Sequence, residues 1–102
     1  MVNLLREQRP AIAELCRRFE VARLTLFGSA VTADFDPGHS DVDFLVEFDA
    51  GSPLSRFDAY FGLKEGLEGL LGYPVDLVAL RALENPYFAE TVRRTQEEIY
   101  AA

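Results

Sequence analysis

The spacing of apolar residues in the first third of the chain predicts one helix followed by one strand. Apolar side chains recur at helical intervals over residues 10–19, and Pro10 suits a first helical turn. β-Branched Val21 and Thr25 then stand among leucines, as is typical of a strand, and the pair Gly28-Ser29 ends it. Residues 30–40 begin as a helical turn and continue as a loop.

The middle of the chain predicts a second strand and then a long helix. Over residues 42–48, apolar residues alternate with Asp43, Leu45 and Glu47, as expected for a strand with one face in the core. Leucine and phenylalanine then recur at helical spacing over residues 54–71, and Gly72 suits the cap that ends this helix.

The last third predicts a third strand and a closing helix. Residues 74–80 form a mostly apolar strand, and a helix follows over residues 83–100, entered at Asn85-Pro86, with Glu97-Glu98 on its solvated face. The order helix, strand, turn, strand, helix, strand, helix predicts an α/β (α+β) fold. Its small mixed sheet has three strands, or four, and its helices pack mainly on one side.

Composition narrows the class of partner. The 102 residues suit one small domain, residues 1–102. A core of this size stabilises a fold only marginally, so a homo- or hetero-oligomer is compatible with the sequence. The net charge of −7 disfavours direct binding to nucleic acid and suits a cationic ligand or a basic protein partner. The lone Cys16 allows no internal disulfide, which fits the cytoplasm, and no apolar run is long enough to span a membrane.

Two aspartates set one residue apart, Asp41 and Asp43, are the most informative residues. On a strand their side chains project from the same face, where two carboxylates repel each other. A divalent cation is the usual way to offset that repulsion, although the pair could simply solvate a strand end. The spacing therefore predicts a Mg²⁺ site, or a Mn²⁺ site.

The residues that precede this pair suit a phosphate. Gly28 has no side chain, so backbone N–H groups could approach a phosphate closely. Ser29 adds a hydroxyl and could cap the turn that follows. Ser40, directly before Asp41, could fix the loop or hydrogen-bond a carboxylate, and it is a candidate nucleotide-binding residue with Gly28 and Ser29. Gly28-Ser29 alone would be an ordinary turn, and only its partner motif makes it a candidate phosphate loop.

A third carboxylate lies in the third predicted strand. Asp76 stands between Val75 and Leu77, where a charge is costly unless it is paired or bound to a metal. If this strand lies beside the second, Asp76 joins Asp41 and Asp43 on one face. It could then hold a metal and accept the proton of an attacking hydroxyl, or it could cap or pair with an arginine.

Three other features have plain structural interpretations. Residues 34–38 suggest a calcium loop, but from Asp34 the required glycine and glutamate positions hold His39 and Leu45. His39 is interpreted as a loop residue. The aromatic set of Phe57, Tyr60 and Phe61 is interpreted as core or partner surface, not as a platform for stacking bases.

Together these residues resemble a known family. The run Gly28-Ser29, ten residues, Ser40-Asp41-Val42-Asp43, then a strand with Asp76, resembles the DNA polymerase β-like nucleotidyltransferase superfamily, and specifically its minimal nucleotidyltransferase (MNT) branch. The resemblance implies that Asp41, Asp43 and Asp76 are catalytic metal ligands and that Gly28 and Ser29 bind the phosphates of a nucleotide. It further implies transfer of AMP from ATP, by a type VII-like antitoxin, to a tyrosine of a HEPN-type toxin.

One position departs from the family pattern. Members commonly continue Gly-Ser with x-Ala-Arg-Gly, whereas here Thr32 replaces the arginine and Ala33 the glycine. Arginine can contact a phosphate through two parallel hydrogen bonds, and threonine cannot. Two functions therefore stay open: an adenylyltransferase that modifies its partner, or a weakly active or inactive antitoxin that neutralises its partner by binding. Transfer to a small molecule is a third option, disfavoured because it usually needs a second domain.

Overall fold

The structure is a computed structural model that describes residues 2–32, 35–36, 38–51 and 55–102. One mixed sheet has the strand order β3-β2-β1-β4, in which β2 and β3 are parallel and the other neighbours antiparallel. The elements are α1 (Val2–Glu7), α2 (Arg9–Arg18), β1 (Val21–Phe27), η1 (Gly28–Ala30), β2 (Val42–Phe48), α3 (Arg56–Leu71), β3 (Val75–Ala79), η2 (Leu80–Glu84), α4 (Pro86–Thr95) and β4 (Glu97–Ala101).

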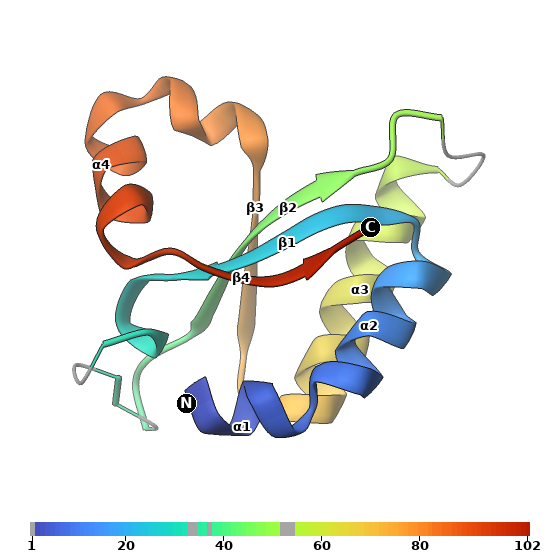
Figure 1. Cartoon of the computed structure of the whole chain (residues 1–102), viewed down its shortest axis with the longest axis horizontal. Coiled ribbons are helices and arrows are strands. Elements are labelled where there is room, and N and C mark those ends of the chain that lie inside the picture. Colours follow the sequence, from blue (N-terminus) through green and yellow to red (C-terminus); the bar gives the residue numbers. More distant parts are fainter. Residues whose placement is uncertain (1, 33–34, 37, 52–54) are drawn as a thin grey trace.

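Helices α1, α2 and α3 gather on one side of the molecule and α4 stands apart from them (Figure 1). Val42, Phe44 and Val46 of β2 are buried in the main core with residues of α1 to α3. The predicted alternation of β2 is thus confirmed, as is the α/β class with most helices on one side. Among the described residues, no helix is long and apolar enough to cross a membrane.

Helices α2 and α3 approach each other closely because α3 has glycines at the contact. A Cβ on Gly62 would overlap the ring of Phe19, and one on Gly66 would lie 2.8 Å from Cδ2 of Leu15. α3 nevertheless runs unbroken from Arg56 to Leu71. Glycine, poor in helix propensity, is used here to bring two helices together.

The ends of α3 follow the expected capping chemistry. Leu54, where the predicted helix begins, lies outside the described residues, and α3 starts at Arg56 after the N-cap Ser55, whose hydroxyl accepts from the N–H of Asp58. Gly72 takes φ +76°, the left-handed conformation of a C-cap, which confirms the predicted end.

The aromatic set on α3 divides between surface and interior. Phe57 and Phe61 are 70% and 44% exposed and contact each other, with ring centroids 4.7 Å apart. Tyr60 is half-buried, and its hydroxyl donates to the carbonyl oxygen of Leu77 at 3.1 Å. The core interpretation is wrong for Phe57 and Phe61, and the partner-surface interpretation stays a prediction.

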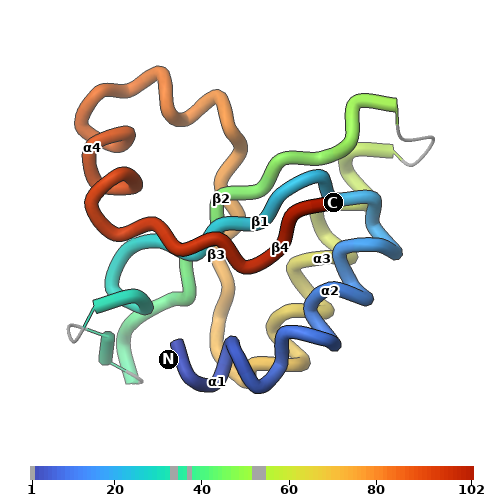
Figure 2. The backbone as a smooth tube through the Cα atoms, in the orientation of Figure 1, coloured from blue at the N-terminus to red at the C-terminus, as the bar shows by residue number. Residues whose placement is uncertain are grey.

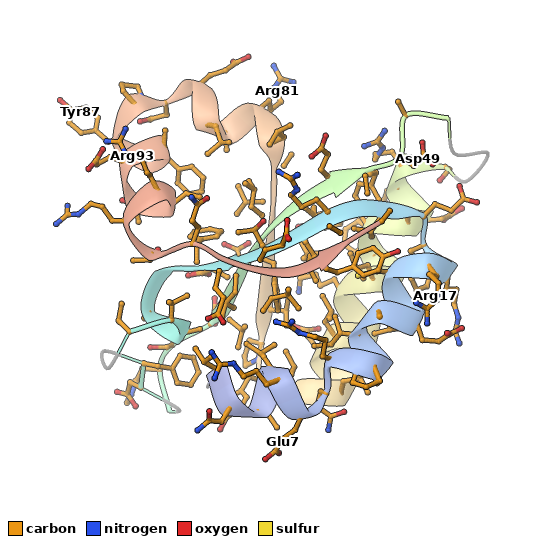
Figure 3. All side chains as sticks on the ribbon, viewed as in Figure 1. Glu7, Arg17, Asp49, Arg81, Tyr87 and Arg93 are labelled. Carbon is orange, nitrogen blue, oxygen red and sulfur yellow. The ribbon has the colours of Figure 1, made fainter. Side chains whose placement is uncertain are left out.

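The opposite face of the sheet carries a smaller apolar cluster under α4. Phe27, Leu45 and Val92 are buried there, and the ring of Phe88 meets Phe27 edge-on at 5.3 Å. On the outer side of α4, Tyr87 and Arg93 point into solvent (Figure 3). This cluster fixes α4 against the face of the sheet from which Asp43 projects.

The end of the chain differs from its prediction. The single helix over residues 83–100 is wrong: α4 ends at Thr95, and Glu97–Ala101 forms β4, antiparallel to β1 (Figure 2). Glu97 and Glu98 therefore lie on a strand and not on a helix face. β4 pairs with the free edge of β1 and buries Ile99 in the main core, a tertiary gain that outweighs local helix propensity. Helix α1 was also not predicted, and it buries Leu5 in the same core.

Candidate active site

Two of the predicted carboxylates lie side by side on neighbouring strands of the sheet. Asp43 on β2 is the register partner of Asp76 on β3. Val75 and Leu77, on either side of Asp76, are buried in the main core, so Asp76 projects from the opposite face. By the same alternation, Asp43 projects from that face too. Asp41 is exposed and directly precedes β2, so the structure brings all three predicted acids to one end of β2 and β3.

The environment of Asp43 opposes its ionisation. Burial is the main cause, followed by the charges of Asp76 and Asp41, and together they raise the pKa of Asp43 to about 6. The carboxylates of Asp41 and Asp76 therefore lie near enough for their charges to act on Asp43.

The chemistry of these residues fits a hard divalent cation. Among the described residues, no three His, Cys, Asp or Glu side chains converge closely enough to hold a metal ion by themselves. Mg²⁺, however, usually takes one or two carboxylates and completes its shell with waters and substrate phosphates. The carboxylate oxygens of Asp43 and its neighbours suit such an ion. Its positive charge would offset the burial and the repulsion that raise the pKa of Asp43.

Gly28 lies directly against the carboxylate of Asp43. It follows the end of β1, has φ +78°, and a Cβ placed on it would be 2.8 Å from Oδ2 of Asp43. Only glycine meets both requirements, the left-handed backbone and the absence of a side chain. The loop predicted to bind phosphate and the predicted metal ligands are therefore adjacent.

The N–H of Gly28 is already donated within the protein. Its acceptor is Oγ1 of Thr95, 2.8 Å away at the end of α4. A phosphate at this loop would thus be bound by Ser29 or by later donors, rather than by the N–H of Gly28. Thr95 was not among the predicted site residues because it stood inside a predicted helix, far from the motif in sequence.

Ser29 of the turn η1 is hydrogen-bonded to Thr32, two residues beyond the end of that turn. The carbonyl oxygen of Ser29 accepts from the N–H of Thr32 at 3.1 Å and from its hydroxyl at 3.2 Å. At the position of the family's arginine, the Thr32 side chain thus bonds the loop itself. Ala33, the second departure, and Asp34, at the start of the rejected calcium loop, lie outside the described residues.

Ser40 organises the loop before Asp41. Its hydroxyl accepts from the N–H of Asp36 at 3.0 Å, and its own N–H donates to the carbonyl oxygen of Asp36 at 2.7 Å. His39 is exposed, and its Nδ1 lies 2.9 Å from Oδ2 of Asp36. Both residues close a local turn, in agreement with the loop interpretation of His39, and the nucleotide-binding role of Ser40 stays a prediction.

Comparisons with known proteins give relatives over nearly the whole chain. A family model described as a nucleotidyltransferase domain matches residues 9–100. Protein adenylyltransferase MntA from Thermococcus cleftensis is 42% identical over 81 residues, 79% of this chain and 77% of that protein.

Solved structures give the same picture. One assigned as a minimal nucleotidyltransferase is 38% identical with a TM-score of 0.71, over 91% of this chain and 90% of that chain. A toxin–antitoxin complex solved with AMP-PNP is 25% identical with a TM-score of 0.66, over 92% of this chain and 73% of that chain. The expected resemblance and fold are confirmed.

Proposed function

Because the chain belongs to the nucleotidyltransferase domain family, we propose that it transfers AMP from ATP to a protein partner, a HEPN-type toxin that it neutralises in the cytoplasm. Residues 1–102 act as one minimal catalytic domain, and the partner supplies the acceptor hydroxyl. Two relatives support this choice. One is named a protein adenylyltransferase, and another is a toxin–antitoxin complex that binds an ATP analogue.

The three carboxylates divide the work of the site. Asp41 and Asp43 would hold Mg²⁺ or Mn²⁺, and Asp76 would share a metal. When bound, the cation supplies the positive charge that the carboxylates and the triphosphate both need. Ser29 would bind a phosphate of ATP at the edge of the loop, and Ser40 keeps the loop before Asp41 in its turn.

The reaction is a displacement at the α-phosphorus of ATP. The acceptor oxygen, from a tyrosine side chain of the partner, forms a bond to that phosphorus while the bond to the bridging oxygen breaks and pyrophosphate leaves. Asp76 takes the proton of the attacking hydroxyl, for which its place opposite Asp43 and its exposure to solvent are suitable.

One observation carries the proposal: the backbone of Gly28 lies against a carboxylate that is itself the register partner of another carboxylate. A loop suited to phosphate, placed beside paired acids, is what nucleotidyl transfer requires.

Labelled ATP tests the reaction. With Mg²⁺ and a HEPN-type toxin that the protein neutralises, ATP labelled at the α-phosphate should label the toxin, and ATP labelled at the γ-phosphate should not. Label arriving from the γ-phosphate would indicate a kinase. No label from either position, with a folded partner present, would refute AMP transfer.

Neutralisation by binding alone is the second candidate, favoured by the bonding of Thr32 to Ser29 where the family has arginine. An Asp41→Asn/Asp43→Asn double variant separates the two functions in cells that express the toxin. Protection that persists in the double variant supports binding, whereas lost protection with an intact complex supports catalysis.

A further inference from the structure

A residue from the far end of the chain holds the Gly28-Ser29 loop. The N–H of Gly28 donates to Oγ1 of Thr95 at 2.8 Å. The same hydroxyl lies 2.9 Å from the carbonyl oxygen of Thr91. Because a backbone N–H can only donate, the hydroxyl of Thr95 accepts from Gly28 and gives its own proton to the carbonyl oxygen of Thr91.

The elements on both sides of Thr95 are anchored to the sheet. Before it, α4 packs through Val92 into the apolar cluster with Phe27. After it, the N–H of Gln96 donates to the carbonyl oxygen of Val92 at 2.7 Å, and Glu97 pairs with Leu26 of β1. The position of the Thr95 hydroxyl is therefore held by the packing of α4 before it and by the pairing of β4 after it.

The bond from Thr95 affects the site because the backbone of Gly28 lies very close to Asp43. A Cβ on Gly28 would be only 2.8 Å from Oδ2 of Asp43, so a small movement of the loop would change a short distance between the loop and the carboxylate. Where reacting groups must be aligned, a displacement of about 1 Å can lower a rate on the order of 100-fold.

We propose that Thr95 is a positioning residue, which sets the distance between the Gly28-Ser29 loop and the carboxylate of Asp43 through its bond to the Gly28 N–H. The inference rests on the proposed function, in which this loop and Asp43 serve the same ATP. Thr95 acts through Gly28 and does not itself touch the reacting groups.

Substitutions at Thr95 have a matched control one turn earlier. Thr91 also uses its hydroxyl within α4, donating to the carbonyl oxygen of Tyr87 at 3.2 Å. Thr95→Val removes the hydroxyl but keeps the branched shape, Thr95→Ser keeps the hydroxyl, and Thr91→Val makes the same chemical change away from the loop.

Steady-state AMP transfer with Mg²⁺, ATP and the HEPN-type toxin measures the effect. In Thr95→Val, kcat should fall about tenfold or more while KM for ATP changes less than about threefold, since misalignment acts on the transition state more than on ground-state binding. Thr95→Ser should restore kcat, and Thr91→Val should match the wild type. Wild-type kcat in Thr95→Val, or an equal loss in Thr95→Ser or Thr91→Val, would overturn the inference.

Amide hydrogen exchange at Gly28 tests the same bond without nucleotide, metal or acceptor. The Gly28 N–H should exchange about fivefold faster or more in Thr95→Val, as expected for the loss of one hydrogen bond, and at the wild-type rate in Thr95→Ser. Unchanged exchange in Thr95→Val would overturn the inference. A wild-type protein that transfers no AMP would refute the proposed function instead, and the exchange rates would still decide the role of Thr95.

Discussion

Asp43 on β2 and Asp76 on β3 are register partners on adjacent parallel strands, with their side chains on the face opposite the main core. Adjacent strands lie about 4.8 Å apart, so two carboxylates in this relation repel unless a proton or a cation intervenes. Phe27, the antiparallel partner of Asp43, ends β1 directly before Gly28. The two aspartates therefore lie beside the end of β1, where the candidate phosphate loop begins.

The raised pKa of Asp43 predicts that removing its charge stabilises the metal-free protein. The pKa of Asp43 in the folded protein is about 6, above the ordinary aspartate value of 3.8. The free energy of unfolding therefore falls as pH rises from about 4 to 6, and this loss persists in full above pH 6. Asp43→Asn should therefore raise the free energy of unfolding at pH 7.5 by about 1 kcal/mol, after allowance for solvent screening.

Denaturant unfolding between pH 4 and pH 8, without divalent ions, measures this difference. The gain from Asp43→Asn should shrink toward pH 4, where the wild-type carboxyl is protonated. Asp58→Asn, at an exposed position on α3, provides the control and should show no comparable gain. A variant Asp43→Asn that is less stable than the wild type at pH 7.5 would contradict the electrostatic account.

Alanine substitutions at two glycines with positive φ distinguish the effect of backbone strain from the effect of a side chain placed in the site. Gly28 (φ +78°) meets Asp43, whereas a Cβ added to Gly72 (φ +76°) would have no neighbouring atom within 4 Å. Alanine at either position should cost about 1 kcal/mol or more of unfolding free energy, because the left-handed backbone disfavours a side chain. Only Gly28→Ala should also abolish AMP transfer. Equal activity of the two variants, measured well below their melting temperatures, would be evidence against the close approach to Asp43.

The α2–α3 contact predicts different effects on stability for alanine at two glycines of one helix. Gly69→Ala has open space and should stabilise the protein by about 0.5–1 kcal/mol through helix propensity. Gly62→Ala gains the same propensity but overlaps the ring of Phe19, so its unfolding free energy should fall below that of Gly69→Ala. Thermal unfolding of the two variants decides, and a Gly62→Ala protein as stable as Gly69→Ala would show that the helices do not need the glycine.

Cys16 should be inert in the folded protein. Its side chain is fully buried on α2, and burial raises the pKa of the thiol to about 12. A thiol reagent such as Ellman's reagent should label it only at the rate at which the protein unfolds. Fast labelling under native conditions would mean that α2 opens locally or packs differently.

Local patterns predicted the elements that carry the motif. Strict alternation in β2 fixed which residues meet the core, and the isolated charge of Asp76 marked the strand beside it. The glycine at position 72 ended α3 as its conformational freedom suggested. These predictions depend on contacts close in sequence, or on the cost of burying a charge, which can be read from residue types.

What escaped prediction depends on distant contacts. Glu97–Ala101 is a strand because the edge of β1 is available to it, a fact absent from the local sequence. Thr95 reaches Gly28 only once β4 has turned the chain back along β1. The place of Gly62 at the helix contact is likewise visible only in the fold, where Phe19, the C-cap of α2, lies against it.

The role of the paired carboxylates can be decided by comparing AMP transfer in Asp43→Asn and Asp58→Asn under identical conditions, with Mg²⁺, α-labelled ATP and the HEPN-type toxin. Both changes remove one carboxylate charge, but only Asp43 is paired with Asp76 and covered by Gly28. We expect Asp43→Asn to lose transfer by about 100-fold or more while Asp58→Asn retains the wild-type rate. Transfer at the wild-type rate by Asp43→Asn would show that these carboxylates are not the active site.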